Sequence, residues 1–271
     1  MKSRKRRRRG ARRPVLRTAS WAAALLLALF GGYEFKDGLQ QAGGSVLSVF
    51  TGESDVSEGD TGFVPEGYTV RTRDEIVSMV TLPTYAGNAY EYVNGGVPLF
   101  TEQEFTEQSF AYYSELDELG RCGVCMASIG QDLMPDEERG NISEVKPTGW
   151  HSVTYDGIDG GSLYNRCHLI GFQLTGENAN PQNLITGTRY LNVDGMLDFE
   201  NKVANYVSDT GNHVLYRVTP VFEGDNLLAS GVLMEAESVE DRGESLEFCV
   251  YCFNVQPGIS INYADGNSEK E

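Results

Sequence analysis

The chain has 271 residues, and 40% of them are hydrophobic, which suffices for one large domain with extensions. Its formal net charge of −17 is unevenly distributed. Residues 1–17 hold ten basic side chains and no acidic one, so the remainder has 12 basic against 39 acidic groups, a net charge near −27 (12 − 39 = −27). Such a body repels polyanions at long range. A broad nucleic-acid-binding surface is therefore excluded, and any nucleic-acid contact must be confined to a local basic cleft or bridged by a metal.

The N-terminus has the pattern of an export or anchoring signal. The basic region 1–17 precedes an apolar segment, 18–35, whose uncharged run extends from Trp21 to Tyr33. The basic block predicts that the N-terminus stays inside the cell and the rest lies outside. The apolar run is shorter than the ~20 residues of a full span, but no convincing cleavage site follows it. We expect a single-pass membrane anchor, with secretion after signal cleavage as the alternative. A basic nucleic-acid-binding arm before a core helix is a third interpretation.

The rest of the chain divides by composition. Residues 36–62 are rich in Gly, Ser and acidic side chains and have little to bury, so they are expected to form a flexible acidic linker. The folded domain is expected over residues 63–263. Residues 264–271 are expected to be a polar tail.

Several segments of the domain have recognisable local signals. A capping box, Thr101 to Glu104, predicts a short helix after Phe100. The apolar run over residues 123–129 predicts a buried strand. Residues 150–155 and 162–170 flank a Gly- and Asp-rich turn and predict a hairpin. Apolar residues at helical spacing predict a helix over 192–207. Further strands are expected over residues 213–222, 227–234 and 246–255.

This order of elements predicts an α+β domain with a mostly antiparallel sheet. Its central part, residues 150–207, has a hairpin followed by a helix. The chemistry-bearing residues are concentrated in that part.

Two neighbouring segments bear the residues expected for phosphodiester cleavage. The first is Tyr-Asn-Arg-Cys-His-Leu-Ile-Gly, residues 164–171, and the second is the asparagine-rich segment 176–192. Histidine accepts a proton near neutral pH, arginine binds phosphate as a planar cation, and amide oxygens are ligands for a hard metal. Together the segments resemble the DNA/RNA non-specific endonucleases of the ββα-metal (His-Me finger) type. That family has an Asp-Arg-Gly-His motif, followed by a metal-binding asparagine on the next helix.

The resemblance, which covers roughly residues 110–262, implies a role for each matching residue. His168 would be the general base and Arg166 a phosphate ligand. Asn192 would be the protein ligand of a single Mg²⁺ ion, Asn183 a substrate-binding residue and Glu200 an active-site carboxylate. Each residue also has an ordinary structural interpretation: a core histidine, a surface charge, a helix N-cap, a loop residue and a boundary salt bridge.

Some of these positions can also be judged from the residues alone. Arg166 and His168 are two positions apart and lie on the same face of the predicted strand. Glu200 lies about 40° from Met196 in helical projection, at the edge of the apolar face, where a buried carboxylate needs a partner. Three other arginines are candidate phosphate ligands that the sequence does not separate: Arg121, Arg139 and Arg189.

The remaining histidines and the five cysteines need separate consideration. His151 and His213 are expected to be structural. Two Cys-x-x-Cys pairs, Cys122/Cys125 and Cys249/Cys252, could bind zinc. Both pairs lie in strand-like segments, where residues three apart point to opposite faces, so we expect a disulfide between the segments instead. Cys167 is expected to be unpaired.

The resemblance implies a magnesium-dependent endonuclease that acts on DNA and RNA through their backbone phosphates, with Mn²⁺ as a substitute metal and 5′-phosphate products. Asn165 and Cys167 stand where the family has Asp and Gly, which puts the positioning of this loop in question. Two alternatives stay open. One is a non-catalytic surface protein that keeps the fold and captures DNA, and the other is a zinc-dependent exported hydrolase.

Overall fold

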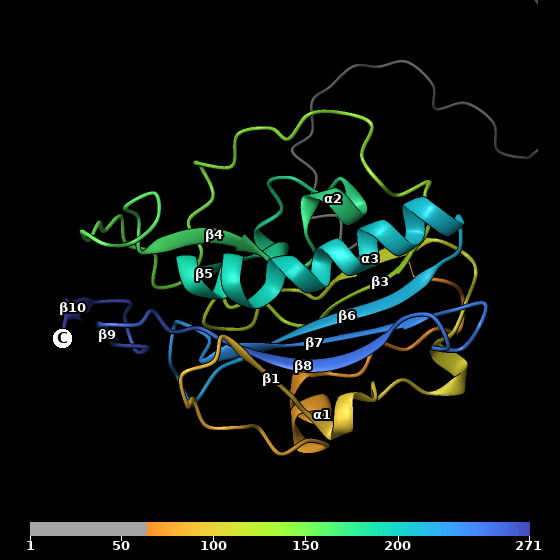
Figure 1. The fold of residues 1–271 in the computed structure, drawn as a ribbon, viewed down its shortest axis with the longest axis horizontal. Helices are drawn as coiled ribbons and strands as arrows, with labels where there is room; N and C mark the ends of the chain where they lie inside the picture. Colours follow the sequence, from red (N-terminus) through yellow and green to blue (C-terminus); the bar gives the residue numbers. More distant parts are fainter. Residues whose placement is uncertain (1–63) are drawn as a thin grey trace, which may run out of the picture. The chain divides into compact units, whose positions relative to one another are not determined.

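The computed structural model describes residues 64–271 (Figure 1). The predicted basic region, the signal or anchor segment and the acidic linker lie outside these residues. Within the described part, no helix is both long enough and apolar enough to cross a bilayer.

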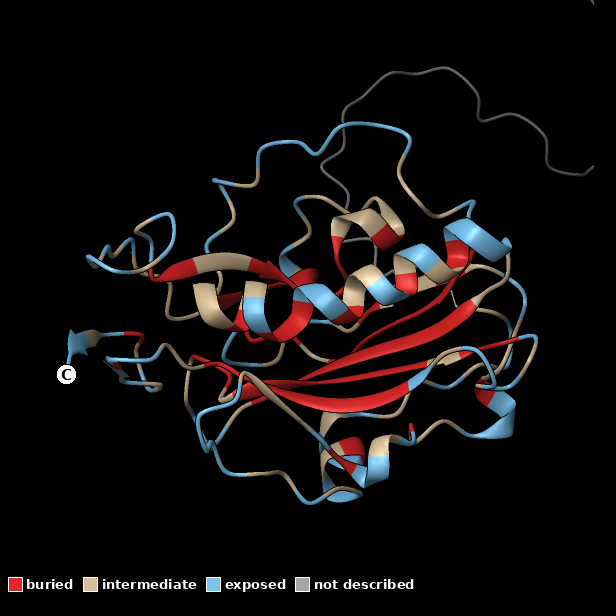
Figure 2. Cartoon of the chain, viewed as in Figure 1, coloured by how far each residue is buried: buried red, intermediate tan, exposed pale blue. Residues whose placement is uncertain are grey.

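A six-stranded antiparallel sheet forms the centre of the domain, in the order β1-β8-β7-β6-β3-β2. The strands are β1 (Tyr90–Tyr92), β2 (Phe110–Tyr113), β3 (Cys125–Ile129), β6 (Val214–Val221), β7 (Gly231–Ser238) and β8 (Glu247–Phe253). One face is covered by helix α3 (Leu197–Thr210) and the two-stranded sheet of β4 (Tyr164–His168) and β5 (Leu184–Thr188), and the other by the N-terminal segment with α1 (Arg73–Ser78) (Figure 1). Because both faces are covered, the middle strands are buried over nearly their whole length (Figure 2). The predicted α+β class with a mostly antiparallel sheet is confirmed.

The short elements connect these layers. They are the 3₁₀ turns η1 (Asn94–Gly96), η2 (Glu102–Glu104) and η3 (Pro181–Asn183) and the one-turn helix α2 (Phe172–Thr175). The predicted capping box is present, since the Glu104 carboxylate accepts a hydrogen bond from the Thr101 backbone N–H at 2.6 Å. It caps a 3₁₀ turn rather than a longer helix.

The predicted hairpin at 150–170 is wrong in its strand pairing. Residues 150–155 contribute only the single bridge Thr154↔Ser162, whereas β4 pairs along its length with β5, and His168 lies opposite Leu184. The ββα unit therefore consists of β4, β5 and the helical segment after β5. Strand β5 was not predicted. All five of its residues are buried, so it lacks the alternation of polar and apolar residues that marks a half-exposed strand, and it lies between an asparagine-rich loop and a helix.

The apolar face of the predicted helix 192–207 is confirmed. Phe199, Val203 and Val207 are fully buried against the sheet, and Phe199 contacts the ring of Phe248 at 4.9 Å. Its first turn, Leu191–Met196, is a π-helix, which runs directly into α3. The predicted strand 227–234 is displaced, since Leu228 packs instead in a separate cluster with Leu163 and Ile259.

The C-terminal residues are not a free tail. β10 (Ser268–Lys270) pairs antiparallel with β9 (Ile259–Ile261). The Tyr164 hydroxyl donates to the Gly266 carbonyl at 3.0 Å, and His151 Nε2 lies 2.9 Å from the Asp265 carbonyl. The predicted boundary at 263 is therefore wrong, because these polar residues satisfy their backbone groups against the domain.

The predicted disulfide between the two cysteine pairs is also wrong. All five cysteines are free and buried. Cys125 lies in β3 and Cys252 in β8, and β6 and β7 separate these strands. At a strand spacing of about 4.8 Å, the separation is roughly 14 Å. A disulfide requires Cα atoms within about 7 Å. Cys167, which was expected to be unpaired, is buried in β4.

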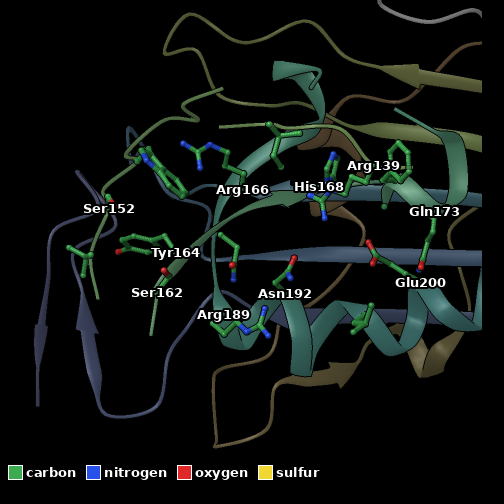
Figure 3. A pocket seen from close by; sticks show the side chains of 17 residues that line it. Arg139, Ser152, Ser162, Tyr164, Arg166, His168, Gln173, Arg189, Asn192 and Glu200 are labelled. Carbon is green, nitrogen blue, oxygen red and sulfur yellow. Dashed lines mark hydrogen bonds between the residues drawn. The ribbon is translucent and has the colours of Figure 1, made fainter. Parts of the chain in front are cut away.

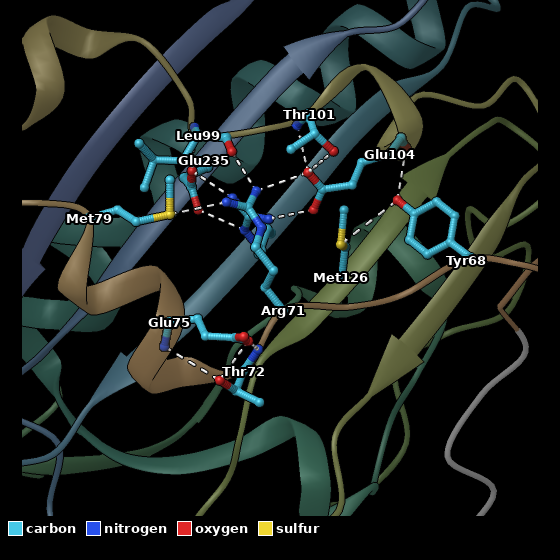
Figure 4. A network of polar contacts seen from close by, with 11 residues as sticks. Tyr68, Arg71, Thr72, Glu75, Met79, Leu99, Thr101, Glu104, Met126 and Glu235 are labelled. Carbon is cyan, nitrogen blue, oxygen red and sulfur yellow. Dashed lines mark hydrogen bonds and ion pairs between the residues drawn. The ribbon is translucent and has the colours of Figure 1, made fainter.

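A buried ion network lies on the sheet face opposite α3, and local sequence patterns did not reveal it. Arg217 in β6 is fully buried and bonds Glu235 at 2.8 Å and Glu104 at 2.8 Å. Arg71 joins Glu104 at 2.9 Å, and the Leu99 backbone N–H donates to Glu235 at 2.8 Å (Figure 4). The network ties the N-terminal segment to the central strands.

Candidate active site

The side chain of His168 lies at the end of β4 and is only 6% exposed. Its Nε2 lies 2.7 Å from the carbonyl oxygen of Asn178, which can only accept, so Nε2 holds the proton and Nδ1 is the acceptor nitrogen. The guanidinium of Arg139 lies 3.3 Å from Nδ1. Burial, together with this cation, lowers the pKa of His168 to about 4. The imidazole is therefore neutral near pH 7 and can accept a proton.

His168 opens onto a pocket of about 600 Å³ (Figure 3). The polar and charged side chains that line it come from the loop 139–162, from β4 and α2, and from the helical segment after β5. They are Arg139, Ser152, Ser162, Asn165, Arg166, His168, Gln173, Arg189, Asn192 and Glu200. The predicted base, the predicted metal ligand and the predicted carboxylate thus share one pocket.

Asn192 lies in the π-helical turn and does not cap a helix. Its Oδ1 lies 3.1 Å from the buried thiol of Cys167, which can donate to it. In a regular α-helix, Asn192 and Glu200, eight residues apart, would be offset by about 80° around the axis. A π turn has i→i+5 bonds and takes up extra residues, which reduces this offset. The π turn therefore helps to bring both side chains to the pocket.

Glu200 is half-buried on α3 and lines the pocket. Its carboxylate makes no hydrogen bond or ion pair with another of the described residues. Burial raises the pKa of its carboxyl to about 7, and the charge of Arg139 opposes this shift. Gly171 lies against it, since a Cβ at that position would be 2.9 Å from the Glu200 carboxylate. An unpartnered carboxylate at this depth is favoured only when a cation or a proton accompanies it.

Three arginines line the pocket, and Glu200 is the one acidic side chain among its lining residues. The pocket is therefore the local basic cleft that the acidic composition requires. Arg139 is closest to His168, and the sequence had not distinguished it from the other candidates. Arg166 stacks on Trp150 at 4.1 Å and donates to the backbone carbonyls of Ser143 and Val145, so its charge is fixed at the wall of the pocket.

The comparisons with known proteins agree with this geometry. Residues 101–240 match the sequence profile of the family described as DNA/RNA non-specific endonuclease. That match spans more than half of the chain. The chain belongs to this family.

Two solved nucleases are similar in structure. NucA from Streptococcus agalactiae, solved with a magnesium ion bound, is 24% identical, with a TM-score of 0.63 over 73% of this chain and 93% of its own. Sda1 nuclease, solved with a bound zinc ion, is 27% identical, with a TM-score of 0.56 over 68% of this chain and 97% of its own. No curated protein matches the chain.

Two predicted site residues lie away from the pocket in this nuclease. Asn183 is fully buried, and its amide bonds the N–H and the carbonyl of Ile170 at 2.8 and 2.9 Å. A direct substrate contact does not fit this position, because both ends of the amide are used to hold the chain just after His168. Arg121 bonds Asp117 at 2.7 Å and the carbonyls of Gly224 and Asn226, so it is not a phosphate ligand here.

The other two histidines lie outside the pocket, as expected of structural residues. His151 bonds the Asp265 carbonyl, and His213 pairs with Glu240 at 2.8 Å. The alternative of a four-cysteine zinc site does not fit the fold, since β6 and β7 separate the two pairs. Among residues 64–271, no group of three or more His, Cys, Asp or Glu side chains could hold a metal.

The pocket nevertheless has donors that fit a hard divalent cation. The amide oxygen of Asn192 and the unpaired carboxylate of Glu200 are oxygen ligands, which Mg²⁺ and Mn²⁺ prefer. Mg²⁺ keeps most of its waters and needs only one or two protein oxygens. Zinc prefers nitrogen and sulfur donors. The donor set therefore fits magnesium better than zinc.

Proposed function

We propose that this chain is a metal-dependent endonuclease that hydrolyses phosphodiester bonds in both DNA and RNA, with His168 as general base and a single Mg²⁺ ion held by Asn192. The observation that supports this most directly is the hydrogen bond from His168 Nε2 to the Asn178 carbonyl. It leaves Nδ1 free of a proton, in a pocket that also contains Asn192, Glu200 and three arginines.

The reaction follows from these positions. His168 Nδ1 removes a proton from a water, whose oxygen forms a bond to phosphorus while the bond from phosphorus to the 3′-oxygen breaks. The 3′-oxygen leaves with a proton from solvent, and the other product has a 5′-phosphate. Arg139, which lies 3.3 Å from Nδ1, would turn to the phosphate, and Arg166 would add fixed positive charge as negative charge develops.

When bound, the metal supplies Lewis-acid stabilisation of the charge on the phosphate and the leaving oxygen. Asn192 would be its direct ligand, and Glu200 would orient metal-bound waters. Mn²⁺ is expected to substitute for Mg²⁺, because both ions prefer oxygen ligands. Arg189 would contact the substrate backbone further along the pocket. Contacts to phosphates contain no sequence information, so little sequence preference is expected.

The experiment is cleavage of supercoiled plasmid and of a folded RNA by the full chain, with Mg²⁺, with Mn²⁺ and with excess chelator. We expect nicking of both substrates with either metal and none with chelator. If the protein binds plasmid but cleaves it with neither Mg²⁺ nor Mn²⁺, the proposal is contradicted. That result would favour the alternative of a non-catalytic surface protein that captures DNA.

We also propose that the domain acts outside the cell, held by residues 18–35 as a single-pass anchor or released after signal cleavage. The basic block 1–17 before an apolar run supports this proposal. Protease added to intact cells should remove the domain and leave a small anchored fragment, or the domain should be found in the medium. Complete protection of the chain inside cells would contradict it.

A further inference from the structure

The pocket continues beyond the catalytic residues to a region with two unused hydrogen-bond donors. Asn165 Nδ2 and Arg189 Nε are both buried, and neither has a hydrogen-bond partner among the described residues. Both side chains line the pocket. Leaving a buried donor unpaired is unfavourable, so unpaired donors on one wall of a pocket indicate an acceptor-rich ligand.

The strand pairing places these two residues on the same wall. Asn165 in β4 lies opposite Gly187 in β5, which has no side chain to cover it. Arg189 follows Gly187 by two positions, and its backbone N–H extends the pairing by donating to the Leu163 carbonyl at 2.8 Å. Diagonal neighbours of this kind on an antiparallel pair lie about 7–8 Å apart, within reach of one small ligand.

Arg189 is also next to the proposed metal ligand. It is three positions before Asn192 in a helical segment, and residues at this spacing are neighbours on a helix surface. Figure 3 shows Arg189 and Asn192 on the same side of β4. A group bound at Arg189 would therefore lie beside the scissile phosphate and not on top of it.

The present partner of Arg189 can be exchanged. Its Nη2 pairs with Asp159 at 2.7 Å, but that carboxylate is 81% exposed. Exposed ion pairs are weak and compete poorly with a doubly bonded anion. The guanidinium can therefore turn to a ligand without the loss of a strong contact.

We propose that Asn165 and Arg189 form a subsite for a second phosphate, the one adjacent to the scissile phosphate in the same strand. The proposal rests on the proposed nuclease function. Two donors, one of them cationic, suit a phosphate. The carboxylate that contacts Arg189 in the absence of a ligand is the exposed and exchangeable Asp159. A nucleobase would need an open aromatic face, but the ring of Trp150 is covered by Arg166 and Tyr164 is buried.

The test uses short substrates that differ by one phosphate. The full chain is assayed on the dinucleotide dTpdT and on the same dinucleotide with an added 5′- or 3′-terminal phosphate. We expect one of the two added phosphates to raise kcat/KM by about tenfold or more, the effect of a charge-assisted hydrogen bond. The side that responds identifies the direction in which the strand runs through the pocket.

Variants connect this gain to the two residues. In Arg189→Ala and in Asn165→Ala, the gain from the added phosphate should fall below about threefold, and Arg189→Lys should keep part of it. Asp159→Asn removes the competing carboxylate and should increase the gain. Arg242→Ala is the matched control, because Arg242 is exposed, pairs with Glu102 at 3.2 Å and does not line the pocket.

The outcomes separate this inference from the proposed function. If the parent protein cleaves plasmid but gains nothing from either added phosphate, or if both alanine variants keep the full gain, the subsite is refuted and the nuclease function stands. If the parent cleaves no substrate, calorimetric titration with thymidine 3′,5′-bisphosphate against thymidine 5′-monophosphate still decides. Tighter binding of the bisphosphate that is lost in Arg189→Ala supports the subsite, and equal binding overturns it.

Discussion

The carbonyl oxygen of Asn178 lies 2.7 Å from Nε2 of His168 and fixes the tautomer of the imidazole. Because a carbonyl only accepts, the proton stays on Nε2 and the lone pair stays on Nδ1. A half-buried loop residue thus prepares the base before any substrate arrives.

His168→Ala removes the general base and should lower the rate of plasmid cleavage by roughly 10²–10⁴-fold. The fold should persist, because one side chain at the edge of the core is truncated. His151→Ala and His213→Ala are the controls. They lie outside the pocket and should alter thermal stability more than turnover. A His168→Ala protein that digests plasmid at the parent rate would show that this site is wrongly assigned.

Asn192→Ala should also reduce cleavage, but with partial recovery when magnesium is raised, because it weakens metal binding and leaves the base intact. The measurement is rate against Mg²⁺ concentration, with His168→Ala alongside. His168→Ala should show no such recovery. Identical Mg²⁺ dependence in Asn192→Ala and the parent would mean that the metal, if it binds, is not held by this amide.

Glu200→Gln should stabilise the metal-free protein at high pH. Burial raises the pKa of Glu200 from 4.5 to about 7 in the folded state, so folding favours the protonated carboxyl. The stability from this group is fully present below pH 4.5 and is lost as pH rises through 7. We expect the variant to exceed the parent by roughly 2–3 kcal/mol at pH 8 and by less than about 1 kcal/mol at pH 5.

Urea denaturation in excess chelator measures this difference. The exposed Glu244→Gln is the matched control and should change stability little at either pH. A Glu200→Gln advantage that is larger at pH 5 than at pH 8 would reverse the expected sign and would contradict the burial argument.

Arg217→Ala should destabilise the domain by roughly 3–5 kcal/mol, because Glu235 would be left buried without a cation and Glu104 would keep only Arg71. Urea denaturation measures the loss, with the exposed Arg242→Ala as control. Replacement of the whole trio, Arg217→Met with Glu104→Gln and Glu235→Gln, should recover part of the stability. If the single variant is as stable as the parent, the network contributes nothing to holding the N-terminal segment.

All five thiols should be reduced and protected in the native protein. Burial raises the pKa of Cys122 to about 12, and it also raises the pKa of Cys125 and Cys252 well above the usual range, which suppresses the reactive thiolate. A thiol reagent should label five groups in denaturant and react far more slowly in native buffer. Rapid native labelling, or fewer than five thiols after unfolding, would contradict the structure.

Local patterns were sufficient where the side-chain period decides the element. The strands β3, β6 and β8 and the apolar face of α3 lie within the predicted ranges, because alternation and helical spacing are properties of consecutive residues. The partner of a strand is not such a property. Thr154 and Ser162 flank a favourable turn and nevertheless form only one bridge, whereas β4 pairs with β5 across an intervening loop.

The same distinction applies to the site. The sequence by itself determined that His168, Arg166, Asn192 and Glu200 would be candidates, because the segments around His168 and Asn192 resemble the motifs of the endonuclease family. Only the tertiary structure decided that Arg139, 29 residues before His168, lies beside its Nδ1. It also decided that Asn183 is buried and holds the chain at Ile170, and that β6 and β7 lie between the two cysteine pairs. The physical reason is that residue chemistry is encoded locally, whereas burial and long-range pairing depend on how the whole chain packs.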